Sequence, residues 1–155
     1  MGSPFCCRGR SERRKGMKFF RKWMNKVAGN SCTAVVAAAG SSRRMGSDKL
    51  LMPLGEVPVL IRTLRALENC EEITEIIVVT REELIVPVGQ LCRDAVLEKV
   101  TKVVVGGDTR TASVLAGVRE ADDKAQLIAI HDAARPLVSQ RILAETIERA
   151  AAFHA

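Results

Sequence analysis

The stretch AAAGSSRRMGSDK, from Ala37 to Lys49, directly follows the apolar run TAVV at residues 33–36. The chain therefore leaves an apolar strand through small residues and then places Arg43, Arg44 and Lys49 close together. Small residues after a buried strand let backbone N–H groups approach a phosphate, and nearby cations complete an anion-binding loop. Arg44 and Lys49 are spaced to contact a long anion, such as a triphosphate, from two sides. An exposed loop with ordinary surface charges is the alternative.

Two common phosphate-binding motifs do not account for this loop. The pattern G-x-x-x-x-G-K-[ST] is absent, since Lys49 is followed by Leu50, and no G-x-G-x-x-G turn follows the strand. The loop therefore indicates a different type of nucleotide or phosphate site.

Outward from this loop, apolar runs alternate with helical patterns. We expect strands at residues 32–40, 74–80, 101–107 and 125–136, and helices at residues 58–70, 81–96, 111–121 and 139–153. Continuously apolar strands that alternate with helices are buried on both faces, as in a parallel sheet with right-handed crossovers. The sequence therefore predicts an α/β fold with three layers, α/β/α, around a mostly parallel sheet.

Three further details follow from the helical patterns. The helix at residues 81–96 should break near Pro87, which lacks a backbone N–H. Ser139 should cap the last helix. The third helix should turn Val114, Leu115 and Val118 toward the core.

Polar and glycine-rich segments follow the predicted strands, and ligands bind at the carboxyl ends of strands in parallel sheets. Gly106 and Gly107 allow close backbone approach, and Arg110 is placed to hold either the loop or a ligand phosphate. A connector capped by Asp108 or Thr109 is the alternative. Asp132 stands at a strand end, where a carboxylate suits Mg²⁺ that bridges nucleotide phosphates. These segments should meet the first loop at one site.

Charge is unevenly distributed along the chain. Of the net +6, residues 1–26 contribute +8, with nine lysines and arginines against Glu12, which leaves −2 for the remainder. We expect residues 1–31 to form a basic, disordered tail; a helix resting on an anionic membrane and an organelle transit peptide are alternatives. The slightly acidic remainder and an aromatic content of 3% argue against nucleic acid as a partner.

Cysteine usage suggests a reducing compartment. The five cysteines form an odd, scattered set without a C-x-x-C motif, and only two histidines accompany them, so neither a zinc site nor a disulfide framework is indicated. No apolar run is long enough to span a membrane. We therefore expect a cytoplasmic protein with no firm membrane association. The cysteines are Cys6, Cys7, Cys32, Cys70 and Cys92.

Three motifs in series carry a family resemblance: AAAGSSRRMGSDKLLMPLG at residues 37–55, GGDTRTASVLAG at 106–117, and HDAARP at 131–136. In this order and spacing they resemble the 2-C-methyl-D-erythritol 4-phosphate cytidylyltransferase family of the non-mevalonate isoprenoid pathway. The resemblance implies a glycosyltransferase-A-like, Rossmann-like nucleotidyltransferase fold, of which residues 32–155 form the CTP-binding part. It also implies CTP and a sugar-alcohol phosphate, methylerythritol phosphate, as substrates, Mg²⁺ as cofactor, and a homodimer at full length.

The same resemblance implies roles for individual residues. Arg44 and Lys49 match the catalytic pair that stabilises the transition state, and Asp132 matches the carboxylate at the metal. In the implied reaction, a phosphate oxygen of the acceptor attacks the α-phosphorus of CTP in line and pyrophosphate leaves. The residues matched to CTP-binding positions are Ala38, Ala39, Gly40, Ser41, Gly107, Asp108, Arg110, Ser113 and Ala133.

The sequence departs from the family pattern in two places. The segment MGSD between Arg44 and Lys49 is short, where many members carry a longer stretch with proline. The chain also stops at AAAFHA inside a helix, so we expect the C-terminal part with the remaining strands, the dimer arm and the acceptor-binding cations to be missing. Such a chain would expose apolar sheet edge and turn over weakly.

Several alternatives stay open at this point. A ribitol-5-phosphate cytidylyltransferase has much the same motifs, and an inactive nucleotide-binding fragment fits the shortened chain. Molybdenum-cofactor nucleotidyltransferases share a loop like GSSRRMGSDK, but not HDAARP.

Overall fold

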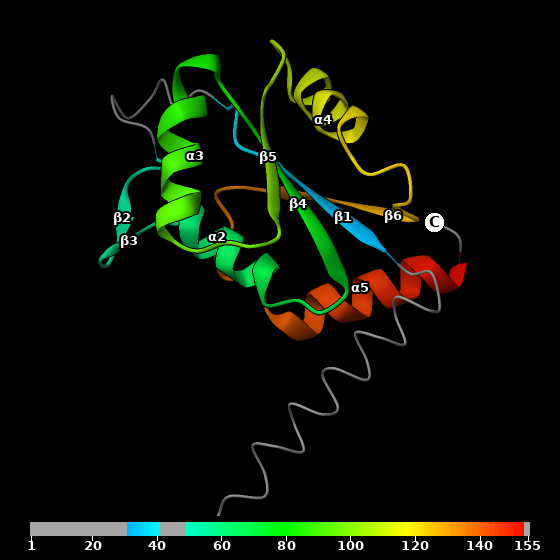
Figure 1. Cartoon of the computed structure of the whole chain (residues 1–155). Coiled ribbons are helices and arrows are strands. Elements are labelled where there is room, and N and C mark those ends of the chain that lie inside the picture. Colours follow the sequence, from blue (N-terminus) through cyan, green and yellow to red (C-terminus); the bar gives the residue numbers. More distant parts are fainter. Residues whose placement is uncertain (1–30, 41–48, 154–155) are drawn as a thin grey trace, which may run out of the picture.

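The computed structural model describes residues 31–40 and 49–153, and its centre is a four-stranded parallel sheet (Figure 1). The strand order is β5-β4-β1-β6, with β1 (Cys32–Ala37) between β4 (Ile73–Thr80) and β6 (Leu127–Asp132). β5 (Val100–Val105) pairs with the outer side of β4. The predicted parallel sheet is confirmed.

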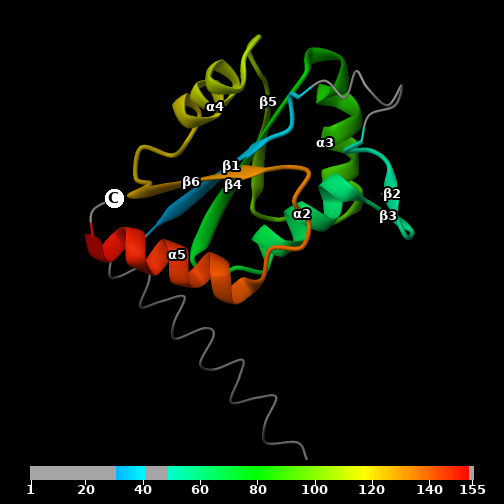
Figure 2. The same cartoon turned by 180° about the vertical axis from the view of Figure 1, so that it is seen from behind.

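Helices cover both faces of the sheet, which gives the three predicted layers (Figures 1 and 2). α2 (Val59–Glu68), α3 (Ile85–Asp94) and α5 (Gln140–Phe153) lie on one face. α4 (Arg110–Arg119) lies on the other face, against β1, β4 and β5.

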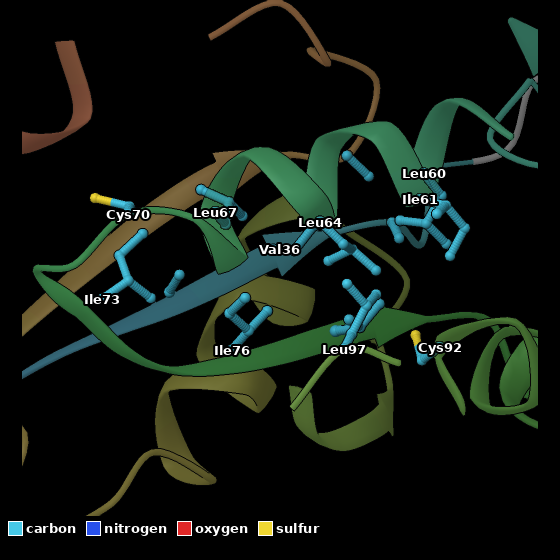
Figure 3. Close-up of a cluster of buried hydrophobic side chains, with 14 of the residues drawn as sticks. Val36, Leu60, Ile61, Leu64, Leu67, Cys70, Ile73, Ile76, Cys92 and Leu97 are labelled. Carbon is cyan, nitrogen blue, oxygen red and sulfur yellow. The ribbon is translucent and has the colours of Figure 1, made fainter. Parts of the chain in front are cut away.

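The larger part of the core lies between α2 and the sheet, where aliphatic side chains interdigitate (Figure 3). Leu60, Leu64 and Leu67 recur at helical spacing on α2 and are completely buried, as are Val36 of β1 and Ile76 of β4. Burying a leucine side chain contributes about 1.5–3 kcal/mol, so this face of the sheet anchors the fold.

α4 approaches the opposite face through small residues. Its buried positions are Ser113 and Gly117, while Leu115 is 46% exposed, so the predicted inward position of Leu115 is wrong. A Cβ atom at Gly117 would lie 2.5 Å from Val35 Cγ1 and 2.7 Å from Val79 Cγ2. Because the helix packs directly on these valines, glycine and serine form the contact face and the larger aliphatic side chains turn partly outward.

The predicted break near Pro87 corresponds to a change of helix type just before it, although Pro87 itself does not interrupt α3. A short 3₁₀ helix, Glu82–Leu84, precedes α3, which runs without interruption and contains Pro87 as its third residue. The first four N–H groups of a helix have no intrahelical acceptor, so the missing N–H of proline costs nothing there.

Other details of the elements agree with the sequence or extend it. Ser139 Oγ accepts a hydrogen bond from Ile142 N at 3.3 Å at the start of α5, which confirms the predicted cap. The sequence patterns missed a small antiparallel pair, β2 (Pro53–Leu54) and β3 (Val57–Pro58), joined through Gly55 at a φ of 72°. This hairpin leads the chain from the first loop into α2.

Among residues 31–40 and 49–153, no helix has the length and apolar character needed to cross a bilayer. On β6, which ends the described sheet, Ile128 and Ile130 are 40% and 51% exposed. The predicted tail at residues 1–31 lies outside the described residues, apart from Ser31.

Candidate functional site

The first and third segments meet at the carboxyl ends of β1 and β6. Ala37, the last residue of β1, is in register with Asp132, the last residue of β6. Beyond this pair, Ala133 N donates a hydrogen bond to Ala37 O at 3.1 Å. The parallel register thus sets the HDAARP turn beside the loop that begins at Ala38.

The first loop stays attached to the sheet for one residue and then turns outward. Ala38 N donates to Val79 O at 2.7 Å, and Ala38 is buried. Gly40 is exposed, and a Cβ atom there would meet no heavy atom within 4 Å. Its backbone therefore borders open space at the rim, where a ligand can approach.

The other end of this loop carries one of the two predicted catalytic cations. Lys49 is exposed in a turn and makes no hydrogen bond or ion pair with the described residues. The next residue, Leu50, is buried, and its carbonyl accepts from Leu60 N at 3.0 Å. Ser41 and Arg44 lie outside the described residues.

The second loop packs against the first through Gly106. Its N–H donates to Thr80 O at 2.8 Å. A Cβ atom at this position would lie 2.7 Å from Ala39 Cβ and 2.7 Å from Ser113 Oγ, so only glycine fits without a shift. The missing side chain at Gly106 lets the loops after β1 and β5 approach each other.

Ser113 organises the second loop from within α4. It is 3% exposed, and its hydroxyl lies 3.1 Å from Gly107 O and 2.9 Å from Thr109 O. Thr109 caps the helix, with its Oγ1 accepting from Ala112 N at 3.0 Å, while Asp108 is exposed and does not cap it. The Ser113 hydroxyl is therefore engaged in shaping the loop.

An ion-pair cluster joins the second and third loops. Arg110 Nη2 lies 2.8 Å from Asp132 Oδ1, and Arg135 Nε lies 3.0 Å from Asp132 Oδ2. The hydrogen bond from Arg110 is the main reason that the pKa of Asp132 lies below its ordinary value, and the charges of Arg110, Arg135 and His131 act in the same direction against partial burial. Asp132 is consequently a carboxylate at neutral pH.

The third loop has its own internal bonds. Arg135 N donates to Asp132 O at 3.1 Å, and His131 Nε2 lies 3.2 Å from Arg135 O. His131 therefore closes the turn, which agrees with a structural histidine.

The oxygen donors at this rim suit a metal ion that is coordinated mainly by the phosphates of a bound nucleotide. Among residues 31–40 and 49–153, no group of three or more histidine, cysteine, aspartate or glutamate side chains comes together. Asp132 offers a charged oxygen, and each carboxylate oxygen has two lone pairs, so one pair stays available beside the arginine bonds. One carboxylate plus phosphate oxygens and water is a common Mg²⁺ environment.

These contacts define how the predicted residues are distributed. Ala38, Ala39, Gly107, Ser113, Ala133 and Asp132 gather at one rim of the sheet, linked directly or through Gly106 and Arg110. Gly40 and Asp108 border the same loops and are exposed. The rim thus combines close backbone approach, the Asp132 carboxylate and exposed guanidinium groups, which suits a charged nucleotide.

Solved structures with the same fold include a 4-diphosphocytidyl-2C-methyl-D-erythritol synthase from Anaerococcus prevotii. It matches with a TM-score of 0.68 and 28% sequence identity, over 79% of this chain and 52% of that one. A Mycobacterium tuberculosis protein crystallised in complex with manganese matches with a TM-score of 0.61 and 25% identity, over 78% of this chain and 60% of that one.

Sequence comparison points to the same family. A curated 2-C-methyl-D-erythritol 4-phosphate cytidylyltransferase from Dictyoglomus thermophilum is 38% identical over 125 residues, which is 81% of this chain and 52% of the relative. The chain spans about half the length of the curated relatives it matches. The family model of 2-C-methyl-D-erythritol 4-phosphate cytidylyltransferase (IspD) matches residues 32–155. The chain therefore belongs to the IspD family of cytidylyltransferases.

Proposed function

We propose that residues 32–155 bind CTP, and that the protein to which they belong transfers the cytidylyl group to 2-C-methyl-D-erythritol 4-phosphate. The products are 4-diphosphocytidyl-2-C-methyl-D-erythritol and pyrophosphate. Family membership supports the reaction class. The observation that carries the proposal is the meeting of three loops at one rim, through Gly106 against Ala39, Ala133 bonded to Ala37, and Arg110 paired with Asp132.

The chemistry needs positioning and charge neutralisation. A phosphate oxygen of the acceptor attacks the α-phosphorus of CTP, the bond to the β-phosphate oxygen breaks, and pyrophosphate takes the electron pair. Negative charge builds on the α-phosphoryl oxygens, where fixed cations stabilise it. We assign this role to Arg44 and Lys49, and removing one such cation should cost on the order of 3 kcal/mol of transition-state stabilisation.

Asp132 is the residue that we assign to the metal. Bound Mg²⁺ would neutralise charge on the nucleotide phosphates. Asp132 is ionised, and Arg110 and Arg135 hold it in place, so its carboxylate can coordinate a metal ion without first losing a proton. Arg110 and Arg135 also limit the negative charge of the rim before the metal arrives.

The nucleotide contacts divide among the loops. Residues 38–41 line the phosphates and ribose with their backbone, Gly107 and Asp108 face the cytosine, and Ala133 lies beside the ribose. Ser113 acts indirectly, because its hydroxyl bonds to Gly107 O and so shapes the base-reading loop. Arg110 contributes a second guanidinium edge that is free for a phosphate, since it is 66% exposed.

Acceptor binding, a homodimer and a cytoplasmic location belong to the proposal for the whole protein. This chain covers about half of the relatives' length, so acceptor contacts and dimer contacts from the unmatched half complete the site. Within the chain, residues 1–31 are proposed to be a basic tail that takes no part in CTP binding.

Two experiments test the proposal. The first is a calorimetric titration of the 155-residue chain with CTP and Mg²⁺, for which we expect tighter binding than with ATP. The second is a pyrophosphate assay on the longest available form of the protein, with methylerythritol phosphate or ribitol 5-phosphate as acceptor. A preference for ribitol 5-phosphate would show that this compound is the acceptor. CTP binding without turnover in every form of the protein would show a nucleotide-binding module. If the chain does not bind CTP, the proposal is overturned.

A further inference from the structure

One buried polar side chain interrupts the apolar face of α2. Thr63 is completely buried, between Leu60 and Leu64 on the face that packs on the sheet. A hydroxyl in such surroundings destabilises the fold unless it is hydrogen-bonded. Its bonding partners therefore indicate why a threonine stands there.

The Thr63 hydroxyl reaches out of its own helix to the third loop. Thr63 Oγ1 lies 2.7 Å from Ala133 O, a residue 70 positions away, and 3.1 Å from Val59 O in the preceding turn. A hydroxyl has one hydrogen to donate. The shorter distance and the buried environment favour Ala133 O, since the Val59 carbonyl is the normal acceptor for the backbone N–H four residues later.

Ala133 is thereby held from two sides. Its N–H donates to Ala37 O of β1 at 3.1 Å, and its carbonyl accepts from Thr63. Ala133 is 1% exposed and directly follows Asp132. One peptide unit on each side of Ala133 is thus tied to a different layer of the domain, the sheet on one side and α2 on the other.

We propose that Thr63 is a positioning residue for the site, whose hydroxyl fixes the turn that carries Asp132 and Ala133. Thr63 touches no ligand and acts through the Ala133 carbonyl. Without this bond the turn keeps its link to β1 but loses its link to α2, so the Asp132 carboxylate samples more orientations. The inference about ligand affinity rests on the proposed CTP site, whereas the inference about the turn does not.

The first measurement needs no ligand. Hydrogen exchange of the Ala133 and Arg135 amides is followed by NMR in the wild type and in Thr63→Val, which keeps the branched shape and removes the hydroxyl. Exchange at both amides should accelerate about tenfold in Thr63→Val, because a buried carbonyl loses its donor. In Thr63→Ser, which retains the hydroxyl, the rates should stay within about twofold of the wild type.

A control removes a bond from a threonine hydroxyl to a carbonyl elsewhere, at an exposed position. Thr74 Oγ1 lies 3.2 Å from Cys32 O, at the amino ends of the strands and away from the site. Thr74→Val should leave exchange at Ala133 and Arg135 unchanged. Should Thr63→Val fail to fold, Thr63→Cys provides a similar size with a weaker donor, and an intermediate acceleration is expected.

The second measurement is the affinity for CTP with Mg²⁺ at a temperature where every variant is folded. Thr63→Val should bind about tenfold more weakly, with Thr63→Ser and Thr74→Val near the wild type. A Thr63→Val protein with uniformly faster exchange, a lower melting temperature and wild-type affinity would show a merely structural residue and overturn the proposal. If the wild type binds no CTP, the proposed function fails, while the exchange experiment still decides whether Thr63 holds the turn.

Discussion

Arg110 Nη2 lies 2.8 Å from Asp132 Oδ1, and this contact joins the start of α4 to the end of β6. It connects two segments that are 22 residues apart in the sequence and that border the same rim. Asp132 receives a second bond from Arg135, so its carboxylate is oriented from both sides. The carboxylate that we assign to the metal is therefore ionised, and the two arginines fix its orientation.

The first prediction concerns the pKa of Asp132. Replacing Arg110 with glutamine removes the main cause of the lowered pKa, so the pKa should rise toward its ordinary value of 3.8. Carboxyl NMR titration in metal-free buffer measures this change. Arg119→Gln, an exposed arginine in the last turn of the same helix, is the control and should leave the pKa of Asp132 unchanged.

The lowered pKa of Asp132 also determines how the unfolding free energy depends on pH. Because the folded-state pKa of Asp132 is depressed, its stabilising contribution is present above the unfolded pKa of about 3.9 and is lost as the pH falls through the folded value. The difference in unfolding free energy between the wild type and Arg110→Gln should therefore shrink as the pH is lowered below about 4. A difference that stays constant down to strongly acidic pH would contradict this account.

The second prediction concerns the close contact of the first two loops. Gly106→Ala should destabilise the fold by about 1–3 kcal/mol, because the new Cβ would meet Ala39 Cβ and Ser113 Oγ at 2.7 Å. Urea unfolding measures the change. Gly40→Ala adds the same methyl group to open space and should leave the unfolding free energy within about 0.5 kcal/mol of the wild type.

The third prediction concerns the two cations at the first loop. The double variant Arg44→Ala, Lys49→Ala should bind CTP with Mg²⁺ at least about tenfold more weakly, because two charges assigned to the phosphates are removed. A double variant that loses Arg141 and Arg149, two exposed arginines of α5, carries the same net charge and should bind like the wild type. Equal affinities in the two double variants would remove both cations from the site.

The sequence predicted much of the sheet because its strands are continuously apolar. Residues 34–36 (AVV) and 76–79 (IIVV) are completely buried, which requires that these strands pack between two layers of helices. Asp132 and Gly107 were predicted from their positions at or just beyond strand ends, whereas the role of Ser113 came from the family resemblance. Contacts between side chains that are far apart in the sequence were not predictable in the same way.

Thr63 illustrates the limit. Periodicity identifies it only as one more position on the inner face of α2, and its partner Ala133 is 70 residues away. The signal was a hydroxyl on an otherwise aliphatic face, which shows that a polar partner exists but not which one. Likewise, the inner face of α4 follows from the contact of Gly117 with Val35 and Val79, whereas hydrophobicity alone pointed to Leu115.

The fourth prediction concerns the buried cysteines. Burial raises the pKa of the Cys32, Cys70 and Cys92 thiols to about 11, with Glu72 adding to the effect at Cys70. Only a small fraction of each is thiolate at pH 8, and the thiolate is the reactive form. Iodoacetamide should therefore leave these three cysteines unmodified in the folded protein and label them after unfolding, as mass spectrometry of peptides would reveal. Rapid labelling of any of them in the native state would contradict the burial.

The central claim is that three loops after separate strands bind one nucleotide together with its metal. Backbone NMR of the ¹⁵N-labelled chain during titration with CTP and Mg²⁺ tests it most directly. We predict that amides in residues 38–40, 106–108 and 132–133 shift together with a single binding constant. Shifts confined to one loop, or gathered at the amino ends of the strands around residues 122–127, would contradict it.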